Sequence, residues 1–387
     1  MHIPKLLKIV KNTSLACFGA YISLSSHLAY AERGVSDTTI TIGASVVLTG
    51  PLGPQTIEYG QGSNLYFDSV NAKGGVNGRK IIYKTIDDGF DPAKALANTQ
   101  KLIQEENVFL IFQNTGTAQT AAILPLITET KTVVFGSITG ASLFRDKFNP
   151  FIFNVRASYA SEAKATIKQF IQIGVKKVAV FYQDDGLGNS ISNEMKKAAK
   201  ELNFELVDFV KLDPKNPDFK TAAAQIEKIA PQALVLASAG KTFTDTINAV
   251  YETSARPSFY GFSVVNHTSV AKLLGPKARG IVLCQVMPSM RDTAVPLVAE
   301  FLNAVKQKDP AASGTDSQFE GFLNAKLLTE GLRKAGRNLT TESLIKSMET
   351  AGETRYGKFS ARYTSTAHIG STYVELAILD ADGQLRR

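Results

Sequence analysis

The chain has 387 residues, of which 44% are hydrophobic and 20% are charged, and its formal net charge is +8. These values are typical of a soluble globular protein with two or three domains. The basic residues are scattered, with only short pairs such as Lys176-Lys177 and Lys196-Lys197, so the charge favours solubility and does not indicate nucleic-acid binding.

Residues 1–31 have the pattern of a secretory signal peptide. Three lysines precede a mostly apolar run over 14–28, and Ala29-Tyr30-Ala31 offers small residues at a cleavage site. A membrane anchor is the alternative, but the run is shorter than the ~20 residues that a span requires. Cleavage after Ala31 leaves 40 basic and 35 acidic residues, a net charge of +5. Cys284 is then the single cysteine, which excludes an internal disulfide and favours a buried, inert thiol.

The first part of the remaining chain alternates short β-rich runs with amphipathic segments. This rhythm predicts a parallel sheet covered by helices on both faces. The expected strands are 40–48, 80–86, 108–112 and 132–137, and the expected helices are 58–71, 92–105 and 117–130.

The rhythm restarts at residue 151 and predicts a second α/β unit of similar size. Its expected strands are 151–155, 176–182, 204–210, 233–238, 258–265 and 280–286, and its expected helices are 161–173, 189–202, 218–229 and 242–253. Three further helices, 295–306, 318–335 and 341–348, precede two tail strands, 357–361 and 373–379.

The glycine-rich stretch 71–92, NAKGGVNGRKIIYKTIDDGFDP, is interpreted as turns around a strand. Gly74 or Gly75 supplies the left-handed residue that ends a helix, and Asn77-Gly78 forms a tight turn. Asp91 caps the next helix, and the aspartates before it do not follow the spacing of a calcium-binding loop. No metal site is therefore expected.

Two sequence patterns of catalytic or nucleotide-binding sites are incomplete in this chain. The stretch ASAGKT (237–242) looks like the end of a phosphate loop, but Val235 stands where the loop needs a glycine. After cleavage only His267 and His368 remain, and no Gly-x-Ser-x-Gly elbow occurs. The sequence predicts no catalytic residues and no cofactor, so an exported hydrolase is the disfavoured alternative.

Small hydroxyl residues follow two neighbouring expected strands, in the sets 114–117 (NTGT) and 137–140 (SITG). Ligands of open α/β sheets bind beyond the carboxyl ends of strands, where helix starts favour negative charge. Ordinary helix capping is the alternative. Two such sets in neighbouring loops favour a binding site for a carboxylate.

The chain resembles the periplasmic solute-binding proteins of branched-chain amino acid type ABC transporters. The resemblance covers nearly all of the chain after residue 31. It rests on the following stretches in this order: ITIGASVVLTGPLGP, FDSVNAKGGVNGRKIIYKTIDDGFDPAKA, VFLIFQNTGTAQTAAILPL, FGSITGASLF and VAVFYQDDGLGNS.

This resemblance implies a type I periplasmic binding protein: α/β, with two doubly wound parallel-sheet lobes joined by three hinge crossovers. The N-terminal lobe would hold 38–155 and 285–355, and the C-terminal lobe 156–284 and 356–387. The protein would be a monomer in the periplasm, would close over a small-molecule carboxylate ligand and would deliver it to a membrane permease. A ligand sensor for a signalling partner is the alternative function.

The family's ligand-binding positions are carried over by motif. In the first lobe they are Gln55, Thr115, Ser137, Ile138 and Thr139, and in the second lobe they are Leu187, Ala239 and Ser263.

The second lobe departs from the amino-acid binders, which carry aromatic residues near Leu187 and Ala239 and an acid near Ser263. A buried ammonium without a counter-charge is costly. An organic or aromatic acid is therefore the leading ligand class, with Phe90, Leu187 and Phe262 at an apolar end. An aliphatic amino acid is second, with Asp184 or Asp185 as a replacement for the missing acid.

Overall fold

The computed structural model describes residues 32–50 and 52–387, so the predicted signal peptide lies outside the described residues. Within this part of the chain, none of the helices combines the length and the apolar character needed to cross a membrane.

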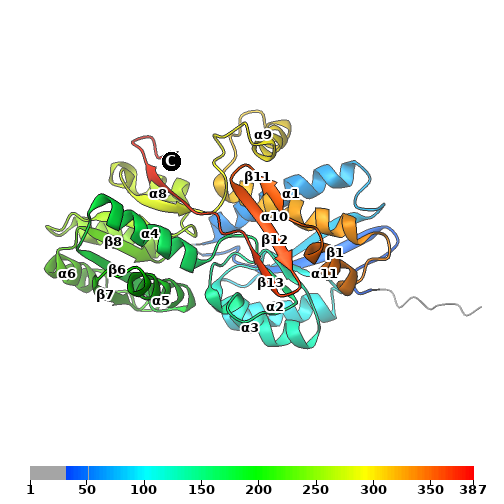
Figure 1. The fold of residues 1–387 in the computed structure, drawn as a ribbon, viewed down its shortest axis with the longest axis horizontal. Helices are drawn as coiled ribbons and strands as arrows, with labels where there is room; N and C mark the ends of the chain where they lie inside the picture. Colours follow the sequence, from blue (N-terminus) through cyan, green and yellow to red (C-terminus); the bar gives the residue numbers. More distant parts are fainter. Residues whose placement is uncertain (1–31, 51) are drawn as a thin grey trace, which may run out of the picture. The chain divides into compact units, whose positions relative to one another are not determined.

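The first lobe contains a five-stranded, fully parallel sheet in the order β2-β1-β3-β4-β5 (Figure 1). Its strands are β1 (Thr39–Val46), β2 (Lys80–Asp87), β3 (Ile111–Phe112), β4 (Val134–Phe135) and β5 (Ile152–Phe153). Its helices are α1 (Gly53–Ala72), α2 (Pro92–Gln104), α3 (Thr117–Glu129), α9 (Pro296–Lys308), α10 (Asp316–Ala335) and α11 (Thr341–Glu349). The predicted order of these elements is confirmed, but β3 to β5 are much shorter than expected, and β5, expected to open the second α/β unit, pairs with β4 in this sheet.

The second lobe contains a seven-stranded sheet in the order β15-β14-β10-β9-β8-β6-β7. Strands β6 to β10 pair in parallel, whereas β14 and β15 add an antiparallel edge. The strands are β6 (Val178–Gln183), β7 (Leu206–Leu212), β8 (Ala233–Ala237), β9 (Ser258–Gly261), β10 (Val282–Gln285), β14 (Glu375–Leu379) and β15 (Leu385–Arg386). The helices are α4 (Tyr159–Ile173), α5 (Gly186–Glu201), α6 (Phe219–Ile229), α7 (Gly240–Tyr251) and α8 (His267–Leu274).

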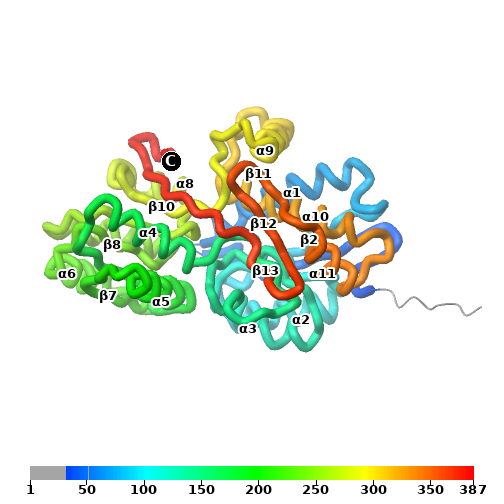
Figure 2. The backbone as a smooth tube through the Cα atoms, in the orientation of Figure 1, coloured from blue at the N-terminus to red at the C-terminus, as the bar shows by residue number. Residues whose placement is uncertain are grey.

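The chain passes between the two sheets three times, after β5, after β10 and before β14. The third passage follows a small antiparallel sheet of β11 (Thr354–Tyr356), β12 (Phe359–Thr364) and β13 (Ala367–Gly370), and Figure 2 shows the tube leaving β13 toward the strand beside β10. Phe359, Ala361 and Tyr363 of this sheet pack in the core of the first lobe. Within 356–387, the small sheet thus packs with the first lobe, whereas β14 and β15 pair in the second sheet.

The local conformations of 71–92 match the turn interpretation. Gly74, Gly75, Asn77 and Gly78 all have positive φ angles, and Val76 pairs with Arg79 across the turn. The Asp91 carboxylate accepts hydrogen bonds from the N–H groups of Ala93 and Lys94, with Pro92 opening α2.

Two features near the second sheet were not predicted. The expected strand 258–265 ends at Gly261, and α8 follows, capped by the Asn266 side chain, which accepts from the N–H of Ser269.

Cys284 is buried in β10 as expected, and burial raises the pKa of its thiol.

Candidate functional site

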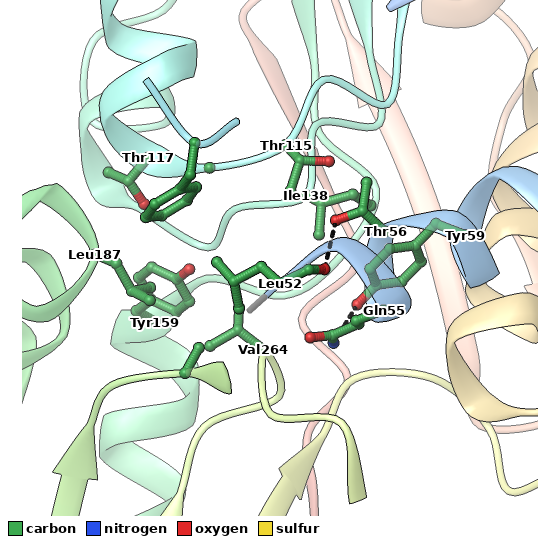
Figure 3. A pocket seen from close by; sticks show the side chains of 13 residues that line it. Leu52, Gln55, Thr56, Tyr59, Thr115, Thr117, Ile138, Tyr159, Leu187 and Val264 are labelled. Atoms are coloured by element: carbon green, nitrogen blue, oxygen red, sulfur yellow. Dashed lines mark hydrogen bonds between the residues drawn. The ribbon is translucent and has the colours of Figure 1, made fainter. Parts of the chain in front are cut away.

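A cavity lies where five of the eight predicted site residues gather (Figure 3). It is called the main cavity below. Thirteen described residues line it, and none of them is charged: Leu52, Gln55, Thr56, Tyr59, Phe90, Thr115, Gly116, Thr117, Ile138, Tyr159, Leu187, Ala239 and Val264.

One wall comes from the loop between β3 and α3. Thr115 pairs with Ile138 of the neighbouring loop as an isolated parallel bridge, which joins the two predicted hydroxyl sets. Gly116 has φ +100° and donates its N–H to the Ile138 carbonyl, and α3 then begins at Thr117. The first-turn N–H groups of a helix lack intrahelical partners and attract negative charge. This wall is therefore suited to an anionic group.

The start of α1 supplies the adjoining wall. Gln55 donates a hydrogen bond to the Tyr59 hydroxyl at 3.1 Å, and the Thr56 hydroxyl donates to the Leu52 carbonyl at 3.3 Å (Figure 3). Phe90 enters from the loop before α2 with φ +67°, and its carbonyl accepts a hydrogen bond from Gln119. Amide, hydroxyl and aromatic groups thus share this side of the cavity.

The opposite wall is mostly apolar. Tyr159 stands at the start of α4, Leu187 at the start of α5, Ala239 just before α7, and Val264 in the loop after β9. Burial raises the pKa of the Tyr159 hydroxyl, which keeps it neutral. These residues offer a hydrophobic surface to the body of a ligand.

Five of the eight predicted site residues line the main cavity together: Gln55, Thr115, Ile138, Leu187 and Ala239. Ser137 and Thr139 are buried beside it instead. The Ser137 hydroxyl donates to Asn114 Oδ1 at 2.5 Å, and the hydroxyls of Thr139 and Thr117 lie 2.8 Å apart. In this structure these two predicted residues support the loops that carry Thr115 and Thr117.

Ser263 lies in a buried cluster outside the lining. Its N–H and hydroxyl donate to the two carboxylate oxygens of Glu162, at 2.7 and 2.8 Å. The Arg156 guanidinium donates to the Ser263 carbonyl at 3.2 Å and to its hydroxyl at 2.8 Å. Ser263 is thus held by a carboxylate from α4 and by a cation from the first crossover.

Glu320 of α10 completes this cluster, with its Oε1 atom 3.5 Å from Arg156 Nε. Arg156 has an exposed fraction of 1%, and its Nε and Nη1 atoms have no hydrogen-bond partner among the described residues. Burial raises the pKa of Glu162 to about 7, although Arg156 and Ser263 act in the opposite direction. Burial also raises the pKa of Glu320, and Arg156 again opposes the shift. The cluster therefore combines a permanent cation with two carboxyl groups whose charge burial disfavours.

Sequence reasoning missed this cluster and several lining residues. Thr117 belongs to the hydroxyl set 114–117. No sequence motif marked the other residues, which are Tyr59, Tyr159, Val264, Arg156 and Glu162. Asp184 and Asp185, the suggested replacements for an acid, do not line the main cavity. Asp184 pairs with Lys211, and Asp185 accepts the N–H of Gly188 at the start of α5. Phe262, expected at the apolar end, is buried in edge-to-face contact with Tyr159.

Known proteins resemble this chain over nearly its whole length. A Leu/Ile/Val-binding protein homolog 3 of Brucella melitensis is 20% identical, with 97% of this chain and 98% of that protein aligned. The crystal structure of a possible leucine/isoleucine/valine-binding protein from Rhodopirellula baltica superposes with a TM-score of 0.85 at 24% identity, covering 91% of this chain and 97% of that one. The solute-binding protein of an ABC transporter from R. palustris, solved in complex with benzoate, gives a TM-score of 0.77 at 19% identity, covering 90% and 95%.

The fold of these structures is the fold described above, with two lobes of predominantly parallel sheets. A sequence model described as "Periplasmic binding protein" matches residues 39–384, which include every element that lines the main cavity. The chain therefore belongs to the periplasmic binding protein family.

Proposed function

We propose that this protein captures a small carboxylate-bearing ligand in the main cavity and delivers it to the permease of an ABC transporter. The observation that carries this proposal is the uncharged wall at Thr115 and Thr117, where hydroxyl groups lie beside the start of α3. Hydrogen bonds to a charged group contribute about 1.5–3 kcal/mol each. A few such bonds and one buried apolar side chain reach the ~8 kcal/mol of a micromolar site.

The ligand class follows from the charges around this cavity. Glu162 accepts two hydrogen bonds from Ser263, Glu320 is paired with Arg156 at 3.5 Å, and neither carboxylate lines the main cavity. An unpaired ammonium in the cavity would be costly, whereas a carboxylate meets hydroxyls and a helix start. We therefore propose an organic or aromatic acid as the ligand, with an aliphatic amino acid second. The benzoate-bound relative supports the first class, and the Leu/Ile/Val-binding relatives support the second.

The setting of this function is also a proposal. We infer that residues 1–31 are a signal peptide cleaved after Ala31, that the mature protein is a periplasmic monomer, and that the ligand is released chemically unaltered. Family membership and the relatives named as transporter components support this setting.

Thermal denaturation of the exported protein against three panels tests the proposal: aliphatic acids, aromatic acids and zwitterionic amino acids. A ligand at 100 times its dissociation constant adds about 2.7 kcal/mol to the free energy of unfolding. We expect stabilisation by members of the acid panels, with the bound compound recovered unchanged by mass spectrometry. Stabilisation by amino acids alone would overturn the ligand class, and recovery of a converted product would overturn the binding function.

A further inference from the structure

A second cavity, called the side pocket below, adjoins the main cavity in the first lobe. It lies between α1 and the carboxyl ends of β1 and β2, and its lining includes the exposed residues Gln61, Asn64 and Thr85. Thr56, Tyr59 and Thr115 line both cavities, so three side chains form the boundary between them. A ligand whose carboxylate lies near Thr115 therefore has a second compartment within reach.

The chemistry of the side pocket differs from that of the apolar wall opposite. Side-chain amides of Gln61, Asn64 and Gln113 line it, together with the hydroxyls of Tyr83 and Thr85. None of its described lining residues is charged. Val46, Leu48 and Ile57 also line it, so the side pocket suits an uncharged part of a ligand that carries a hydrogen-bonding group.

Gln113 is the unusual residue of this pocket. It follows β3 in the same loop as Thr115, is 2% exposed, and has φ +58°, a left-handed conformation that is uncommon for glutamine. Its N–H donates to the Phe135 carbonyl at 2.9 Å, which fixes the backbone in place. Strained backbone that the surrounding structure imposes is often found at ligand sites.

One end of the Gln113 amide lacks a hydrogen-bond partner. The Ser63 hydroxyl donates to its Oε1 atom at 2.5 Å, and Nε2 has no partner among the described residues. Rotating the amide by 180° would let Nε2 donate to Ser63 and would leave Oε1 without a partner instead. A buried amide end left unpaired is costly, and a ligand hydroxyl, which both donates and accepts, would satisfy either orientation.

We propose that the ligand carries an uncharged hydrogen-bonding group, a hydroxyl or a carboxamide, remote from its carboxylate, and that this group occupies the side pocket and pairs with the Gln113 amide. This inference rests on the proposed function, and it makes Gln113 a specificity-determining residue. The natural ligand is then a substituted acid, longer than a simple aliphatic amino acid.

Matched acids test the inference by calorimetric titration of the exported protein. The probes are hexanoate with 6-hydroxyhexanoate and 5-carbamoylpentanoate, and benzoate with 4-hydroxybenzoate. We expect at least one polar member to bind about tenfold more tightly than its unsubstituted partner. In Gln113→Leu, this preference, measured as the ratio of the two affinities in the same variant, should fall below about twofold.

A second variant is needed because position 113 is buried and has a left-handed backbone conformation, which leucine adopts only with strain. Gly60 of α1 lines the side pocket, and a Cβ atom added there meets no protein atom within 4 Å. Gly60→Leu should therefore place a larger side chain at the pocket wall without a clash at Cβ and remove the preference for the polar members, whereas Gly60→Ala should keep it.

The outcomes separate the two proposals. Binding of acids without any preference for the polar members, or a preference that survives in Gly60→Leu, overturns the side-pocket assignment alone. If none of the acids binds, the proposed function fails, and this inference fails with it.

Discussion

The two walls of the main cavity differ in chemistry and in construction. On the first-lobe wall, Thr115 and Thr117 present hydroxyls beside a helix start, and their loop is tied to Ile138 by backbone hydrogen bonds. On the second-lobe wall, Leu187 and Val264 present hydrocarbon. The loop that carries the first-wall hydroxyls is fixed by backbone hydrogen bonds, so these hydroxyls suit a carboxylate that many ligands share. The hydrocarbon side chains of the second wall change in size with each substitution, so they suit the variable body of a ligand. The comparison indicates that the first wall recognises the carboxylate and the second selects the body of the ligand.

The buried cluster of Arg156, Glu162 and Glu320 links α4 to α10 through Arg156 and Ser263, and it gives the largest expected effect. Arg156→Leu leaves two carboxyl groups buried without their cation, so the free energy of unfolding should fall by about 3–5 kcal/mol in urea denaturation. The matched control is Arg355→Leu, because Arg355 is exposed and pairs with Glu353 at the surface. Its effect should stay below about 1 kcal/mol. Equal, small losses in the two variants would contradict a structural role for the cluster.

Glu162 predicts a pH dependence of stability. Its pKa is about 7 in the folded protein, against an ordinary value of 4.5, so folding favours the protonated form. Its stabilising contribution is fully present below pH 4.5 and is lost as the pH rises through 7. Glu162→Gln has no such titration, so its free energy of unfolding relative to the wild type should rise by about 2–3 kcal/mol between pH 4.5 and 8. Stability curves that stay parallel over this range would show that Glu162 is ionised throughout.

Thr115→Val tests the head-group role of the first wall. Apart from a 3.5 Å contact with the Gln113 carbonyl, the Thr115 hydroxyl has no hydrogen bond to the described protein, so the fold should tolerate its loss. Affinity for acetate, benzoate and 4-methylpentanoate should fall by a similar factor of about ten. Thr128→Val, on the exposed side of α3, should change none of them. A loss confined to one acid would contradict a shared carboxylate site.

Leu187→Ala tests the second wall and has the smallest expected effect. Affinity for 4-methylpentanoate should fall by about fivefold because apolar contact is lost, while affinity for acetate stays unchanged. Leu143→Ala, at an exposed leucine that does not line the main cavity, is the control. Equal losses for both acids would show that Leu187 acts on the fold of the site and not on the ligand body.

Sequence patterns alone predicted the two α/β units and the position of the loop that carries Thr115. Period-two and helical patterns report local burial, and hydroxyls after neighbouring parallel strands must meet at one edge of a sheet. The resemblance to a family then supplied Gln55, Leu187 and Ala239 at positions that line the main cavity.

The remaining features depend on contacts between distant parts of the chain. Glu320 meets Arg156 from a helix 164 positions further on, and no local pattern marks such a pair. The Ser137 and Thr139 hydroxyls were expected at the ligand, but neighbouring side chains from Asn114 and Thr117 engage them. The small sheet of β11–β13 packs on the first lobe through Phe359 and Tyr363, which strand patterning alone does not specify.

The most direct test of the central claim is a calorimetric comparison of 4-methylpentanoate with leucine, which share a carbon skeleton and differ in the α-ammonium group. If the hydroxyl wall beside the start of α3 recognises the carboxylate, and none of the described lining residues carries a charge to pair with an ammonium, the acid should bind at least about tenfold more tightly than leucine. Tighter binding of leucine would contradict the account.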